Sequence, residues 1–154
     1  MNLLIVCLGN ICRSPMAEGI LRKKITDKNL QIKVDSAGTS NYHVGESPDT
    51  RAISTALSYG VDISKLKGRQ FFVNDFNNFD RIYVMDSSNF KNIQKLARNE
   101  SDKNKIYYFL RDGEKGIDVP DPWFGELEGF FPVFELLDKA AERILVEIEK
   151  EIIG

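Results

Sequence analysis

The stretch that decides the fold reads NLLIVC at residues 2–7, LGNICR at residues 8–13 and SPMAE at residues 14–18. Its first part is a short, almost continuously apolar run rich in branched side chains, which is typical of a strand buried on both faces of a parallel sheet. A glycine-containing loop follows. Ser14 can cap a helix and Pro15 suits its first position, so the sequence predicts a strand, a loop and a helix start in succession.

The same alternation continues along the chain. Further strands are expected over Gln31–Ser36, Arg81–Met85 and Lys105–Phe109, and further helices over Asp49–Tyr59, from Asp86 to about Arg98, and from about Phe131 onward. The last helix should be amphipathic, because apolar residues recur in it at steps of three and four: Phe134, Leu137, Ala141, Ile144, Ile148 and Ile152. Alternating elements with short connections predict an α/β fold whose parallel sheet is flanked by helices on both faces.

Length and charge exclude several classes of protein. The 154 residues suit one globular domain over residues 1–154, and a net charge of -2 argues against a nucleic-acid partner. No apolar run approaches the roughly 20 residues of a membrane span, so no membrane association is expected. The N-terminus lacks the basic region and cleavage site of a signal peptide, so a cytoplasmic location is expected. Export without a leader peptide stays open as an alternative.

The charge is unevenly distributed along the chain. Basic residues outnumber acidic ones over residues 1–111, and acidic residues outnumber basic ones over residues 112–154. Two interpretations remain open: a solvated acidic helix at the C-terminus, or a basic face that attracts anionic substrates.

The motif that carries chemistry is a cysteine, five residues, an arginine and a serine, placed between the strand and the helix. Such a loop can turn its backbone N–H groups inward and form an anion-binding cup at a helix N-terminus. Arg13 would close the cup with a planar fork that matches two oxygens of a phosphate. Cys7 would lie beneath it in a field that favours the nucleophilic thiolate, and Ser14 could donate to the sulfur. The alternative is that Cys7 merely packs in the core.

Attack on phosphorus leaves an alkoxide or phenolate that needs a proton. Asp121, between Pro120 and Pro122, is the candidate acid on a stiffened loop, although it could also be an ordinary turn aspartate. Asp86 is expected to cap a helix. The only histidine, His43, lies in a loop rich in Gly, Ser and Pro and is expected to be exposed and to take no part. Two cysteines and one histidine cannot make a four-ligand zinc site, so no metal or other cofactor is expected.

Six stretches together closely resemble the low-molecular-weight protein tyrosine phosphatases, and the chain is identified as a bacterial member of that family. They are CLGNICRSPMAE at 7–18, DSAGTS at 35–40, VGESPDTR at 44–51, GRQF at 68–71, VMDSSN at 84–89 and DPWFG at 121–125. The resemblance implies a flavodoxin-like three-layer fold with a four-stranded parallel sheet. It also implies hydrolysis of phosphotyrosine through a cysteinyl-phosphate, with Cys7 as nucleophile, Arg13 as phosphate clamp and Asp121 as general acid and then base.

The resemblance assigns supporting roles as well. Asn10 and Ser36 would hold the loop in a strained shape, and Ser14 would tune the thiolate. The phosphate-binding loop would comprise Leu8, Gly9, Asn10, Ile11 and Cys12. The pocket walls would be Tyr42, Trp123 and Phe124, a shape that favours a flat phenyl ring. Tyrosine-phosphorylated proteins would be the partners, and the enzyme would be a monomer or a weak dimer.

Other activities on the same fold stay open. Relatives that act on phosphoarginine resemble one another in having threonine where this chain has Ile11, and an apolar residue there favours phosphotyrosine. Thiol-dependent arsenate reductases use the same cup with additional cysteines, and this chain has none after Cys12. A phosphate-binding module without activity usually lacks the nucleophile or the acid. The resemblance further suggests that Cys7 and Cys12 form a reversible disulfide under peroxide.

Overall fold

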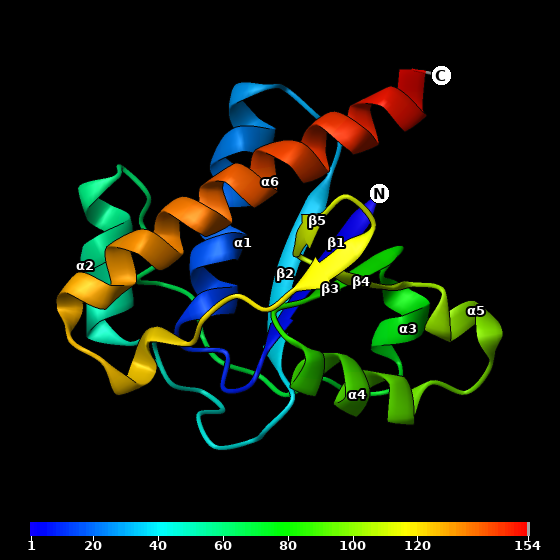
Figure 1. The fold of residues 1–154 in the computed structure, drawn as a ribbon, viewed down its shortest axis with the longest axis horizontal. Helices are drawn as coiled ribbons and strands as arrows, with labels where there is room; N and C mark the ends of the chain where they lie inside the picture. The colour runs from blue at the N-terminus through cyan, green and yellow to red at the C-terminus, as the bar shows by residue number, and fades with distance from the viewer. Residues whose placement is uncertain (154) are drawn as a thin grey trace.

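The computed structural model describes residues 1–153 and places a parallel sheet between two layers of helices (Figure 1). The strands are β1 (Asn2–Cys7), β2 (Lys33–Gly38), β3 (Arg81–Val84) and β4 (Ile106–Tyr108). They lie in the order β2-β1-β3-β4, and all three pairings are parallel. The α/β fold with a four-stranded parallel sheet is therefore confirmed, and its strand order is that of flavodoxin-like folds.

The apolar run of β1 reflects its position in the centre of the sheet. Leu3, Leu4, Ile5 and Val6 are all fully buried. Since successive side chains of a strand point to opposite faces, Leu3 and Ile5 join one core cluster, and Leu4 and Val6 join the other. Cys7 ends the strand on the side of the first cluster.

One face of the sheet is covered by three helices: α1 (Arg13–Asp27), α2 (Thr50–Ser58) and α6 (Phe130–Ile153) (Figure 1). The predicted apolar stripe of α6 is buried at Phe134, Leu137, Ala141, Ile144 and Ile148. Ile152, expected in the same stripe, is 61% exposed instead, in the last turn of the helix. Within residues 1–153, no helix combines the length and apolar character that a bilayer crossing requires.

The opposite face is covered by α3 (Asp75–Asn78) and α4 (Ser87–Leu96), with α5 (Glu100–Lys103) beside them (Figure 1). As predicted, Asp86 is the N-cap of α4, because its side chain accepts a hydrogen bond from the backbone N–H of Asn89. The helix ends at Leu96, two residues before the expected end, and the short α5 was not predicted.

The prediction that Ser14 caps the first helix is wrong. The helix begins at Arg13, Cys12 occupies the N-cap position, and no side chain caps the first turn. Pro15 therefore stands third in the helix, where its missing N–H is still among the first four that have no partner within the helix. The Ser14 hydroxyl is engaged elsewhere: it contacts the sulfur of Cys7.

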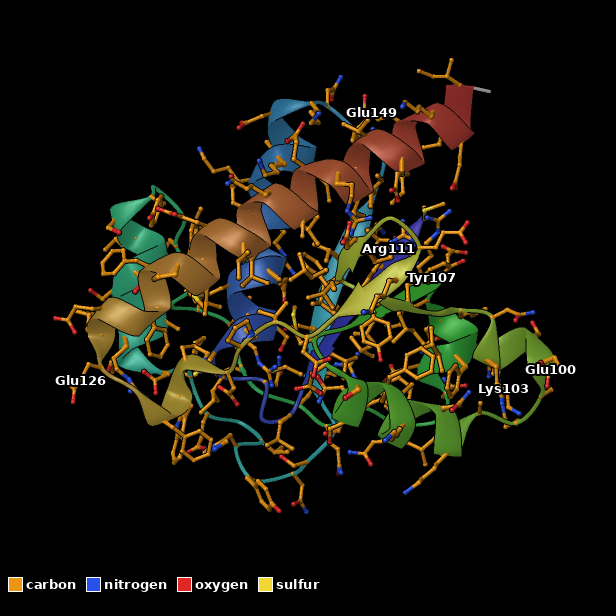
Figure 2. The ribbon with its side chains drawn as sticks, in the orientation of Figure 1. Glu100, Lys103, Tyr107, Arg111, Glu126 and Glu149 are labelled. Atoms are coloured by element: carbon orange, nitrogen blue, oxygen red, sulfur yellow. The ribbon has the colours of Figure 1, made fainter. Side chains whose placement is uncertain are left out.

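The structure also contains a two-stranded antiparallel hairpin that was not predicted, formed by β5 (Leu110–Asp112) and β6 (Lys115–Ile117). Its strands are only three residues long and mix polar with apolar side chains, so no alternation signals them. Arg111 on β5, labelled in Figure 2, lies 3.0 Å from both carboxylate oxygens of Glu147 on α6. This contact ties the hairpin to that helix.

Three acidic residues of α6 are paired with Lys24 of the packed helix α1 and with Lys28, the C-cap of that helix. Lys24 lies 3.3 Å from Asp138 and 3.1 Å from Glu142, and Lys28 lies 2.8 Å from Glu142 and 3.2 Å from Glu149. Basic residues from the first part of the chain thus meet acidic residues from its last part where α1 packs against α6. Such exposed pairs contribute little to stability, because water screens their charges.

Candidate active site

The loop over residues 8–12 begins at the carboxyl end of β1 and leads directly into α1. Since β1 has β2 on one side and β3 on the other, the loop lies at the switch point of the sheet, where ligands bind in folds of this type. The glycine at the end of β2 allows the loop to approach. A Cβ atom on Gly38 would lie 2.8 Å from the carbonyl oxygen of Leu8.

Hydrogen bonds from the neighbouring chain orient the peptide groups of this loop. The carbonyl oxygens of Cys7 and Leu8 accept hydrogen bonds from the backbone N–H groups of Thr39 and Ser40, at 2.9 and 3.0 Å. In a planar trans peptide the C=O and the following N–H point in opposite directions. The N–H groups that follow these carbonyls therefore point away from the Thr39–Ser40 segment.

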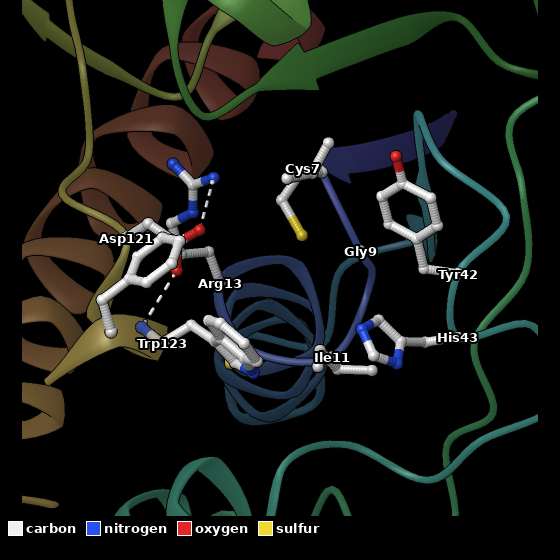
Figure 3. Close-up of a pocket in the computed structure, with 11 residues that line it drawn as sticks. Cys7, Gly9, Ile11, Arg13, Tyr42, His43, Asp121 and Trp123 are labelled. Atoms are coloured by element: carbon white, nitrogen blue, oxygen red, sulfur yellow. Dashed lines mark hydrogen bonds and ion pairs between the residues drawn. The ribbon is translucent and has the colours of Figure 1, made fainter. Parts of the chain in front are cut away.

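Cys7 lies at the bottom of the cup, with only 3% of its surface exposed. Its sulfur is 3.0 Å from the hydroxyl oxygen of Ser14 and accepts a hydrogen bond from the backbone N–H of Asn10 at 3.3 Å. Figure 3 shows the Cys7 sulfur pointing into the space above the start of α1. The sulfur thus has a hydroxyl and a backbone N–H within hydrogen-bonding distance, which suits a nucleophile.

Asn10 has a left-handed backbone conformation, with φ of 57°. Its side chain makes three hydrogen bonds: Nδ2 donates to Ser14 Oγ at 2.8 Å and to Ser36 Oγ at 2.9 Å, and Oδ1 accepts from the backbone N–H of Arg69 at 3.0 Å. The structure thus brings together Asn10, Ser14 and Ser36, as expected. Unusual backbone conformations persist where the surroundings hold them, and these bonds do so here.

Arg13 is buried and held from two sides. Its Nη1 donates to Asp86 Oδ2 and to the carbonyl oxygen of Val119, both at 2.8 Å. Its Nη2 lies 3.5 Å from Asp121 Oδ2. Burial opposes the charged guanidinium, but the nearby negative groups Cys7, Asp86 and Asp121 outweigh it, and the pKa of Arg13 is raised. Arg13 is therefore a permanent, fixed cation.

Asp121 caps the short 3-10 helix η1 (Pro122–Phe124) by accepting a hydrogen bond from the backbone N–H of Trp123 at 3.1 Å. The same carboxylate points toward Arg13 across the cup (Figure 3). Asp121 is therefore an ordinary turn aspartate and at the same time a neighbour of Arg13. A second 3-10 helix, η2 (Leu127–Gly129), leads from this loop into α6.

Contacts on both sides anchor the loop that carries Asp121. On one side the backbone N–H of Val119 donates to Met85 O at 2.7 Å. On the other, Arg51 donates to the carbonyl oxygens of Gly125 at 2.7 Å and Trp123 at 3.1 Å. The sequence analysis missed Arg51 and Val119, because nothing in their local sequence indicates contacts with segments so distant in the chain.

The site contains a cavity of about 260 Å³. It is lined by Cys7, Leu8, Gly9, Ile11, Cys12, Arg13, Tyr42, His43, Asp121, Trp123 and Phe124. The three expected aromatic walls are all present, and Tyr42 and Phe124 are 75% and 84% exposed at the rim. The expectation for His43 needs correction: its side chain is only 31% exposed, lines the cavity and lies 2.5 Å from the Glu46 carboxylate.

Cys12 shares the loop with Cys7 but has a different environment. Both thiols are buried. Burial raises the pKa of the Cys12 thiol well above its ordinary value, and the negative groups Asp49, Cys7 and Asp121 raise it further. Cys12 is therefore a neutral thiol at physiological pH.

Comparisons with known proteins agree with this geometry. The family model described as "Low molecular weight phosphotyrosine protein phosphatase" matches residues 2–153. A protein of that name from Saccharomyces cerevisiae is 42% identical, over 91% of this chain and 90% of its own. The crystal structure of a protein tyrosine phosphatase from Entamoeba histolytica superposes with a TM-score of 0.91 at 36% identity, covering 98% of both chains. Wzb from Vibrio vulnificus, solved in complex with benzylphosphonate, gives a TM-score of 0.84 at 29% identity, over 95% of this chain and 97% of its own. These relatives come from bacteria and eukaryotes alike.

Proposed function

This chain belongs to the low molecular weight phosphotyrosine protein phosphatase family, and we propose that it hydrolyses phosphotyrosine in proteins through a cysteinyl-phosphate. The observation that carries the proposal is that Cys7 and Arg13, at the two ends of one loop, and Asp121, from a distant segment of the chain, line one cavity with an aromatic rim. A thiolate, a guanidinium and a carboxyl group in one cavity supply a nucleophile, an anion clamp and a proton donor.

In the first step the Cys7 thiolate attacks phosphorus, and the bond from phosphorus to the phenolic oxygen breaks. Asp121, in its protonated form, gives its proton to that oxygen, and the tyrosine hydroxyl leaves. The guanidinium of Arg13 and the backbone N–H groups of the loop stabilise the charge on the equatorial oxygens of the transferring group. Asp86 and the Val119 carbonyl hold one side of the guanidinium, so its orientation is fixed before substrate arrives.

In the second step the phosphate leaves the sulfur. The Asp121 carboxylate takes a proton from a water molecule, and the resulting oxygen nucleophile attacks phosphorus as the sulfur–phosphorus bond breaks. Inorganic phosphate departs, and the thiolate and the protonated Asp121 are regenerated. One carboxyl group serves both steps because it faces the leaving group first and the incoming water afterwards.

The depth of the cavity selects the substrate. The Cys7 sulfur is at the bottom of the cup, whereas Tyr42, Trp123 and Phe124 rise around the opening. A phenyl ring spans this distance and can stack on the walls, while the short side chain of phosphoserine cannot place its phosphate over the sulfur. The complex of the Vibrio relative with benzylphosphonate, an aryl phosphate mimic, supports the same preference.

The test compares hydrolysis of phosphotyrosine, phosphoserine and phosphoarginine peptides by the wild type and by Cys7→Ser. We expect rapid turnover of the phosphotyrosine peptide alone, and none by the variant. Preferred hydrolysis of phosphoarginine would replace the proposal by the arginine phosphatase alternative. Arsenate reduction with thiols and no phosphatase activity would replace it by the reductase alternative.

A further inference from the structure

A carboxylate that the proposed reaction does not use lies on α1, one turn beyond the cup. Glu18 is 1% exposed, and its Oε1 accepts a hydrogen bond from Ser36 Oγ at 2.6 Å. Its Oε2 forms an ion pair of 2.6 Å with Arg22 at the surface. Burial raises the pKa of Glu18, while the hydrogen bond from Ser36 and the charge of Arg22 oppose that rise. A buried carboxylate is costly unless it is paired, so its position calls for a reason.

The hydrogen bonds around Asn10 fix the direction in which each neighbour donates. The backbone N–H of Arg69 donates to Asn10 Oδ1, so the other side of the amide must be the NH2 group. An NH2 group can only donate, so Ser14 Oγ and Ser36 Oγ both accept from it. Each hydroxyl then has its own proton left to give.

Those two protons have one close acceptor each. The proton of Ser36 goes to the Glu18 carboxylate, and the proton of Ser14 goes to the sulfur of Cys7, 3.0 Å away. The chain of hydrogen bonds therefore runs outward from the Asn10 amide in two arms, one through Ser36 to the Glu18 carboxylate and one through Ser14 to the Cys7 sulfur. Each arm ends on an acceptor, and the buried Glu18 carboxylate is the acceptor of the first arm.

We propose that Glu18 is a positioning residue that anchors this chain and thereby directs the Ser14 hydroxyl and the Asn10 backbone N–H at the Cys7 sulfur. The catalytic meaning of this inference rests on the proposed role of Cys7 as nucleophile. Without the Glu18 acceptor, Ser36 loses its fixed orientation and holds the Asn10 amide less firmly. Asn10 adopts its left-handed conformation only while its side chain is held, so both donors to the sulfur become less well aimed.

A positioning role and a purely electrostatic role for Glu18 predict opposite changes in the pH at which Cys7 ionises. Removing a nearby negative charge favours a thiolate, so a purely Coulombic role for Glu18 predicts that its removal makes Cys7 ionise at lower pH. Loss of donors to the sulfur makes it ionise at higher pH. The sign of the change therefore separates the two roles.

The experiment measures the rate of alkylation of Cys7 by iodoacetamide against pH, with the modified cysteine identified by mass spectrometry. We expect Glu18→Met to raise the pH midpoint by about one unit. In a Ser36→Ala background the same substitution should add less than about 0.3 unit, because the chain is already interrupted. Arg22→Met is the matched control: it removes the surface partner of Glu18 Oε2 but leaves the hydrogen bond from Ser36 to Glu18 Oε1, and its midpoint should stay within about 0.3 unit of the wild type.

An unchanged or lowered midpoint in Glu18→Met would overturn the inference, as would an equal rise in the wild-type and Ser36→Ala backgrounds. If Glu18→Met does not fold, Glu18→Gln makes the same test, because Arg22 attracts the amide oxygen and an NH2 group then faces Ser36. Alkylation needs no substrate. An inactive wild type would therefore reject the proposed function while the midpoints still decide the role of Glu18.

Discussion

Asp86 supports Arg13 and caps helix α4 with the same carboxylate: Oδ2 accepts from Arg13 Nη1 at 2.8 Å, and Oδ1 accepts from the backbone N–H of Asn89 at 2.8 Å. The guanidinium of the cup is thereby joined to the start of a helix on the opposite face of the sheet. A residue that local sequence identifies only as a helix cap thus also fixes the anion clamp.

Asp86→Asn separates these two roles. The amide can still cap α4 through its oxygen, but its NH2 group would face the donors of Arg13. We expect kcat/KM for an aryl phosphate to fall about 10- to 100-fold, equivalent to about 1.4–2.7 kcal/mol of transition-state stabilisation, with little change in unfolding temperature. Asp102→Asn, which alters a buried aspartate paired with Arg98 in another part of the molecule, serves as the control and should leave kcat/KM unchanged. Equal effects of the two variants would contradict the role of Asp86.

Asp121→Ala removes the proposed proton donor. Because only poor leaving groups need the proton, the variant should slow the hydrolysis of such aryl phosphates by about 10²- to 10⁴-fold and affect esters of acidic phenols much less. The measurement is single-turnover or burst kinetics with a series of aryl phosphates whose leaving phenols increase in acidity. Equal slowing across the series would reject the assignment of the acid.

Peroxide should convert the enzyme to an inactive form that thiols restore. The Cys7 thiolate is oxidised to a sulfenic acid, and the Cys12 thiol then attacks its sulfur, which releases water and forms the disulfide. Mass spectrometry should find a crosslink between the two residues, and Cys12→Ser should be inactivated irreversibly. Detection of Cys7 sulfonic acid alone, with no crosslink in the wild type, would remove this hypothesis.

At acid pH the protein should lose stability as Asp49 becomes protonated. Hydrogen bonds from Arg51 lower the pKa of Asp49, and burial opposes them only in part. An acid with a lowered pKa in the folded state contributes stability above its unfolded pKa of about 4, and this contribution is lost as the pH falls through the folded value. The unfolding temperature of the wild type should therefore decrease more steeply below about pH 4 than that of Asp49→Asn. Parallel curves for the two proteins would show that the pair contributes no pH-dependent stability.

The sequence by itself determined the fold class and the centre of the site. The apolar run of β1, the five residues between Cys7 and Arg13, and the helical spacing in α6 are local patterns, and each requires only neighbours in the chain to take effect. A buried strand that leads through a tight loop into a helix leaves little choice about where the sulfur and the helix N-terminus lie.

Tertiary structure alone decided which distant groups meet that loop. The contacts of Arg13 with Asp86 and Val119, and the hold of Arg51 on the loop after Asp121, join segments separated by more than 70 positions. Ser14 satisfies the pattern of a helix cap, yet its hydroxyl contacts Cys7, because Asn10 and the sulfur lie within its reach only after the loop has closed. The physical reason is that hydrogen bonds and ion pairs depend on distances of about 3 Å, which the packing of the helices against the sheet sets and no local pattern records.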